Sequence, residues 1–207
     1  DMSTQTVICG DSLKIMREMP DKRFDLVLTD PPYGMEFQSN HRNSKHDKIA
    51  GDDAFPLEAL QECQRIARKG VYVCCRWDNL AELPKPTSVL VCVKNNWSMG
   101  DLEHEHGRQW EAIAFYAMEE HKFIKRIADV IRANRTGNVL HPTEKPVDLF
   151  QQLIAANEGD TILDPFLGSG TTLVAAKYLN RNATGIEISE KYCEIARNRL
   201  SQEKLFA

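Results

Sequence analysis

A short apolar stretch that stops at two prolines constrains the fold of this chain more than any other feature. Leu26-Val27-Leu28 has the β-prone character of a buried strand, and Asp30-Pro31-Pro32-Tyr33 follows it closely. Each proline fixes its φ angle and removes a backbone donor, so the strand must end in a stiff loop. An acid, a backbone carbonyl and an aromatic ring are thereby held at a strand's carboxyl end. That arrangement suits a site for a flat, amine-bearing ring.

The rest of the chain alternates strand and helix patterns. Its 207 residues are enough for one α/β domain with a full core and marginal for two. The alternation predicts one doubly wound, mostly parallel sheet with helices on both faces. Within a single domain covering 1–207, we expect a helix over 56–68 closed by Gly70, further strands at 110–118 and 122–127, and substrate loops at about 34–53 and 94–109.

Composition limits the classes of partner and compartment. The net charge of −4 gives no global attraction for nucleic acid, so such binding must rest on local patches. One candidate patch contains Arg42, Lys45 and Lys48, which otherwise form a solvated face. No apolar run is long enough to span a membrane, and the start lacks the apolar core of a signal peptide. Six cysteines without a C-x-x-C pair favour reduced thiols, no metal site and a cytoplasmic location.

A second motif follows the strand predicted at 161–164. Gly168 and Gly170 let the backbone approach a ligand closely, and Glu187 ends the next strand about 20 residues later, where an acid usually binds ribose hydroxyls. No lysine follows to meet phosphates, and Asp164 would repel them. A cofactor with positive charge and no phosphate, S-adenosylmethionine, suits this turn better. A purely structural glycine turn is the alternative.

Taken together, Asp30-Pro31-Pro32-Tyr33 and the stretch from Asp164 to Thr172 resemble the amino-methylating DNA methyltransferases. The catalytic motif precedes the cofactor motif, as in their permuted beta class. The segments from His141 to Pro146, from Gly185 to Ile188 and from Gly10 to Ser12 match further elements of that family, so the resemblance spans nearly the whole chain. It implies a seven-stranded methyltransferase sheet, with 1–140 as the catalytic-motif half and 141–207 as the cofactor-binding half.

The resemblance also implies the site residues. The catalytic set is Asp30, Pro31, Pro32 and Tyr33. The cofactor-binding set is Asp11, Ser12, Asp30, Pro31, His141, Thr143, Lys145, Asp164, Pro165, Phe166, Gly168, Ser169, Gly170, Thr171, Thr172, Glu187 and Ile188. For Lys145 a helix cap is the alternative role, and for Phe166 it is plain core packing.

The implied reaction follows from the electronics of the substrate. An exocyclic amine of a base is a poor nucleophile because its lone pair is delocalised into the ring. Asp30 and the Pro31 carbonyl can each accept one N–H bond, and Tyr33 can stack on a base flipped out of double-stranded DNA. With Asp rather than Ser at position 30, the resemblance implies adenine-N6 methylation in a specific sequence, in a restriction-modification context, by a chain that can form a homodimer. Cytosine-N4 methylation and a catalytically silent binding subunit are the alternatives.

Overall fold

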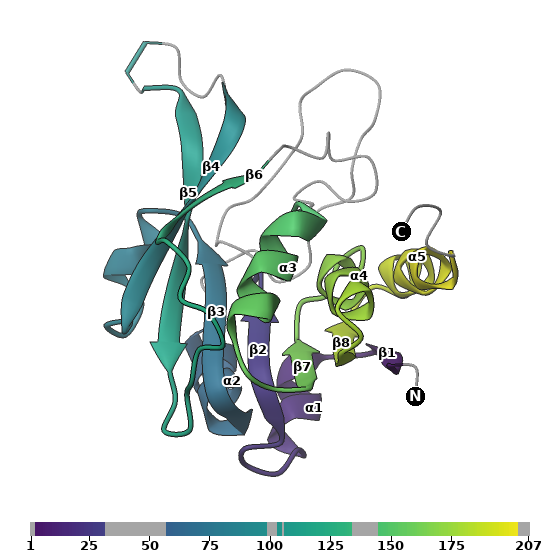
Figure 1. The fold of residues 1–207 in the computed structure, drawn as a ribbon. Helices are drawn as coiled ribbons and strands as arrows, with labels where there is room; N and C mark the ends of the chain where they lie inside the picture. The colour runs from purple at the N-terminus through teal and green to yellow at the C-terminus, as the bar shows by residue number, and fades with distance from the viewer. Residues whose placement is uncertain (1–2, 32–56, 99–102, 105, 134–144, 203–207) are drawn as a thin grey trace.

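The computed structural model describes residues 3–31, 57–98, 103–104, 106–133 and 145–202. The described strands form one eight-stranded sheet (Figure 1). In order across the sheet they are β1 (Gln5–Cys9), β8 (Asn182–Glu187), β7 (Thr161–Asp164), β2 (Phe24–Thr29), β3 (Ala67–Cys75), β5 (Arg108–Ala117), β4 (Ser88–Ser98) and β6 (Val130–Ala133). Only β5 runs against its neighbours, so the prediction of a mostly parallel α/β sheet is confirmed.

Helices cover both faces of the sheet, each over its own apolar core (Figure 1). One face carries α3 (Val147–Ala156) and α4 (Thr171–Tyr178), and the other carries α1 (Ser12–Arg17) and α2 (Leu57–Ile66). A short 3-10 helix, η1 (Asn79–Ala81), follows β3, and α5 (Glu190–Ser201) ends the described chain. All six residues of β2 are buried, as expected for a strand with helices on both sides. Among the described helices, none combines the length and apolar composition needed to cross a membrane.

Four sequence predictions about the fold are wrong. Gly70 does not close a helix: α2 ends at Ile66, and Gly70 lies within β3, where its backbone packs against the Phe115 ring. The segment 122–127 is not a strand; Phe123 makes only an isolated bridge, and the additional strand is β6. The predicted loop 94–109 is partly strand, because β4 continues to Ser98 and β5 starts at Arg108. The described sheet therefore has eight strands rather than seven.

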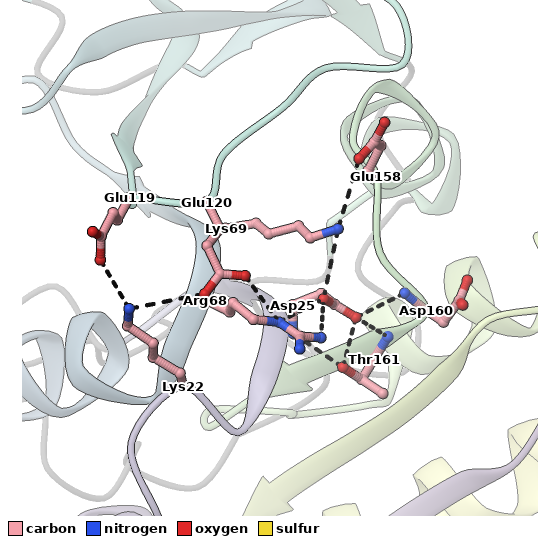
Figure 2. Close-up of polar contacts among 9 residues, drawn as sticks. All are labelled: Lys22, Asp25, Arg68, Lys69, Glu119, Glu120, Glu158, Asp160 and Thr161. Carbon is pink, nitrogen blue, oxygen red and sulfur yellow. Dashed lines mark hydrogen bonds and ion pairs between the residues drawn. The ribbon is translucent and has the colours of Figure 1, made fainter.

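A buried carboxylate ties together the amino ends of β2, β3 and β7 (Figure 2). Asp25 accepts hydrogen bonds from the Arg68 guanidinium, from the Asp160 N–H at 2.9 Å and from the Thr161 N–H at 3.1 Å. Burial alone would raise the pKa of Asp25, but these donors outweigh it and hold the pKa below its usual value. The cluster lies at the opposite end of the strands from the predicted site, so it serves stability.

Replacing Asp25 with alanine is expected to lower the free energy of unfolding by about 2–4 kcal/mol, because buried donors lose their acceptor. Glu120→Ala is the matched control. Its half-exposed carboxylate lies 3.9 Å from Arg68, and its loss should cost less than about 1 kcal/mol. Since the folded pKa of Asp25 is lowered, its contribution is present above the unfolded pKa and lost as the pH falls through the folded one. Urea unfolding at neutral and acid pH checks both points, and equal costs for the two variants would contradict them.

Candidate active site

Four carboxylates meet along one edge of the sheet. Asp11, Glu187, Asp164 and Asp30 follow or end β1, β8, β7 and β2, which are consecutive parallel strands. Because parallel strands end at the same edge, side chains far apart in the sequence are brought together there. The ladder pairs Cys9 with Glu187, Asp164 with Gly185 and Val27 with Leu163, which aligns these strand ends. The two predicted half-sites therefore share one edge.

The glycine turn between β7 and α4 has a left-handed backbone at both glycines. Gly168 has a φ of 53° and Gly170 a φ of 90°, in the region that glycine tolerates best. Gly170 is the N-cap of α4, and a Cβ there would lie 3.0 Å from the Ala196 Cβ on α5. The turn is tied to β8, because the Leu167 N–H donates to the Ile186 carbonyl at 3.0 Å. Its backbone is thus fixed at the strand ends.

Glu187 is held by backbone donors at the end of β8. Its Oε2 accepts the Gly168 N–H at 2.8 Å, and its Oε1 accepts the Ser189 N–H at 2.9 Å. Each carboxylate oxygen can accept a further bond. The side chain is half-buried, and the neighbouring Ile188 is 58% exposed. Backbone donors therefore hold Glu187 in one orientation, and both of its oxygens can accept a further donor.

Asp164 is a buried acid at the centre of this edge. It is 3% exposed, accepts the Thr172 hydroxyl, and accepts the Phe166 N–H at 3.1 Å. Burial raises its pKa to about 7 despite these two donors, and the charges of Asp30 and Glu187 push in the same direction. A nearby cation would stabilise the ionised form of a carboxyl group in such surroundings. This is the charge that the sequence analysis expects of the cofactor.

Asp30, at the end of β2, is paired with a buried lysine. Lys145 Nζ lies 2.9 Å from Asp30 Oδ2 and 3.2 Å from Glu111 Oε2. The side chains of Asp30 and Lys145 are 14% and 7% exposed. Lys145 does not cap α3, whose N-cap is Pro146. Lys145 therefore contacts the predicted catalytic acid directly, and its contact with the cofactor stays a prediction.

Two further charged residues near Asp30, Glu111 and its second partner Lys94, were not predicted from the sequence. Glu111 lies on β5 and pairs with Lys94 of β4 as well as with Lys145. A usable signal existed: Glu111, Ile113 and Phe115 alternate along one strand, so an acid occupies an inward-facing position. Acids rarely occupy such positions unless they are paired.

The other predicted residues fall into four groups. Asp11 is the N-cap of α1, which Ser12 begins. Pro31 and Pro165 are buried, and Phe166 is half-buried, packing on the core from the site edge. The hydroxyls of Ser169 and Thr171 accept hydrogen bonds from Arg199, each at 3.2 Å, so their side chains hold α5 in place. The remaining predictions lie outside the described residues: Pro32, Tyr33, Arg42, Lys45, Lys48, His141, Thr143 and the loop 34–53.

Comparison with known proteins decides the family. The N6 and N4 methyltransferase profile, described as DNA methylase, matches residues 93–198, about half of the chain. The chain belongs to this DNA methylase family. The matched stretch includes Glu111, Lys145, Asp164 and Glu187, and Asp30 precedes it.

Relatives cover most of the DNA methylase chain. It is 30% identical to the putative methylase YubD of Escherichia coli (strain K12), over 94% of this chain and 89% of the relative. It is 28% identical to the type II methyltransferase M.HpaI of Haemophilus parainfluenzae, over 96% of this chain and 75% of the relative.

Solved structures share the methyltransferase fold. The M1.HpyAVI-SAM complex matches with a TM-score of 0.72 at 20% identity, over 95% of this chain and all of that chain. The PvuII DNA methyltransferase (cytosine-N4-specific) matches with a TM-score of 0.76 at 14% identity, over all of this chain and 89% of that chain.

Proposed function

We propose that this chain transfers a methyl group from S-adenosylmethionine to the exocyclic N6 amine of adenine in a specific DNA sequence. The observation that carries the proposal is the common edge at which Asp164 ends β7 and Asp30 directly follows the neighbouring strand β2. Membership of the DNA methylase family supports the reaction class. The proposal treats residues 1–207 as one methyltransferase domain, with base chemistry in 1–140 and cofactor binding in 141–207.

The residues at the ends of β7 and β8 fit S-adenosylmethionine. The buried Asp164 would face a positively charged group, and the backbone-held Glu187 would accept ribose hydroxyls. Half-buried Phe166 and exposed Ile188 offer apolar surface beside them. When bound, the cofactor supplies an activated methyl group on a sulfonium. A relative structure named as a SAM complex shares this fold, which agrees with the fit.

On the other side of the edge, Asp30 and Pro31 would hold the base. Asp30 accepts one amine N–H and the Pro31 carbonyl another, which draws the nitrogen towards a tetrahedral shape. Alignment of nitrogen and methyl is a positioning effect, and the Asp30 carboxylate stabilises positive charge developing on the nitrogen. Tyr33 is proposed to stack on the flipped base, whose extrusion from the duplex costs a few kcal/mol.

Cytosine N4 is the second candidate target, because the lone pair of its exocyclic amine is delocalised into the ring as in adenine. The matching profile covers N6 and N4 enzymes, and the PvuII enzyme of similar fold is cytosine-N4-specific. Asp rather than Ser at position 30 favours adenine.

Incubation with labelled S-adenosylmethionine and DNA of varied sequence, followed by nucleoside analysis, tests the proposal. N6-methyldeoxyadenosine confined to one sequence context is the expected product. N4-methyldeoxycytidine would favour the second candidate. Cofactor binding without methyl transfer to any DNA would contradict both and favour a silent binding subunit.

A further inference from the structure

A chain of alternating charges runs from Lys94 on β4 to Asp30, the proposed catalytic acid. Lys94 pairs with Glu111, Glu111 with Lys145 at 3.2 Å, and Lys145 with Asp30 at 2.9 Å. The side chains of Lys94 and Glu111 are 23% and 21% exposed, and those of Lys145 and Asp30 are 7% and 14% exposed. Glu111, Lys145 and Asp30 come from three segments that lie far apart in the sequence. The ion pairs are therefore a product of the tertiary fold.

Strand alternation explains why these groups meet. Leu28, Cys74 and Ile113 belong to the core beneath α3, so Asp30 and Glu111, two positions along from Leu28 and Ile113, point to that same face. Lys145 comes two residues before α3 begins, and its buried side chain carries the ammonium to Asp30 and Glu111. Cys74 is buried on β3, between β2 and β5. Burial raises the pKa of its thiol, and the charges of Asp30, Lys145 and Glu111 also act on that pKa.

Burial makes this arrangement costly unless each charge is held by its partners. The charges of Lys145 and Lys94 outweigh the burial of Glu111 and lower its pKa to about 2, so Glu111 is ionised at neutral pH. An ammonium held by Asp30 alone could swing on its flexible stem, carrying the carboxylate with it. A second carboxylate at 3.2 Å fixes the nitrogen in one place.

We propose that Glu111 is a positioning residue, which anchors the Lys145 ammonium so that it holds the Asp30 carboxylate in the orientation that receives the target amine. This inference rests on the proposed function and deepens it. Glu111 itself touches neither base nor cofactor in this account. Glu111 affects the orientation of Asp30 through Lys145. The experiment therefore measures whether the effect of replacing Glu111 depends on Lys145.

The experiment is a double-mutant cycle on DNA methylation. Glu111→Gln keeps the shape and removes the charge, and is expected to lower kcat by about 10- to 100-fold while the cofactor Kd changes by less than about twofold. Lys145→Met should lower kcat at least as much. In the Lys145→Met background, Glu111→Gln should lower kcat by no more than about twofold further, because its route to Asp30 is already gone. Glu194→Gln, an exposed acid on α5, is the matched control and should match wild type.

Three results would overturn the inference: equal losses from Glu111→Gln in both backgrounds, kcat unchanged in the single variant, or a loss confined to thermal stability or cofactor affinity. A crystal structure of the Glu111→Gln variant gives an answer even if the wild type methylates no DNA. A rotated Asp30 carboxylate or a displaced Lys145 supports positioning. An unchanged pair, still at the wild-type 2.9 Å, refutes it. Failure of the proposed function shows instead as wild-type inactivity.

Discussion

Replacing Asp30 with alanine is expected to lower kcat for DNA methylation by about 10³-fold, with cofactor affinity within about threefold of wild type. The variant loses both the acceptor that orients the amine and the charge that stabilises the developing cation. The protein should remain folded, because Asp30 lies at a strand end and Lys145 keeps Glu111 as a partner. Single-turnover methyl transfer and cofactor titration measure the two effects separately.

Two further variants sharpen this prediction. Asp30→Asn keeps an oxygen that can accept the amine N–H but carries no charge, so its kcat should fall between wild type and alanine. Asp129→Ala removes an exposed carboxylate just before β6 and should leave kcat unchanged. Turnover by Asp30→Ala within tenfold of wild type, or an equal loss of cofactor binding, would contradict the assigned role.

Replacing Asp164 with asparagine is expected to weaken S-adenosylmethionine binding by about 100-fold at pH 8, because a buried charge facing a cation is lost. In the wild type, affinity should rise with pH through about 7, the raised pKa of Asp164, since only the ionised acid attracts the cation. The asparagine variant should lack this component of the pH dependence. Titration calorimetry from pH 6 to pH 8 on both proteins checks it.

The same substitution should not destabilise the fold. Burial raises the folded pKa of Asp164 above its unfolded value. The contribution of Asp164 to the free energy of unfolding is therefore present at low pH and is lost as the pH rises through about 7. An amide removes that cost, and the Thr172 hydroxyl can turn to accept its N–H. The melting temperature at pH 8 should equal or exceed that of the wild type. A variant that melts earlier and still binds the cofactor tightly would refute the account of Asp164.

The site was predictable where its signals are local. The strand ending at Asp30, the glycines at 168 and 170 and the acid at the end of β8 each follow from short patterns, and parallel topology brings them together. Glu111 was missed because its role depends on where an antiparallel strand lies relative to Lys145. The alternation along β5 marks Glu111 as inward-facing, but its contact with Lys145 joins segments far apart in the sequence, which no short motif indicates.

The errors in the fold have similar physical causes. A glycine after an amphipathic stretch reads equally well as a helix end or as a strand residue, and packing against Phe115 decides for Gly70. The edge strand β6 has four residues, two exposed and two buried, which is too short a pattern to separate from the turn before it. Tertiary contacts, absent from local sequence, settle both cases.

The central claim is that the ends of β2 and β7 form one crevice in which the methyl donor faces Asp30. A crystal structure of this chain with S-adenosylmethionine bound tests it most directly. The account predicts ribose hydroxyls at Glu187, the positively charged methionine end beside Asp164, and the methyl group directed towards Asp30. Cofactor bound elsewhere, or a methyl group directed away from Asp30, would contradict it.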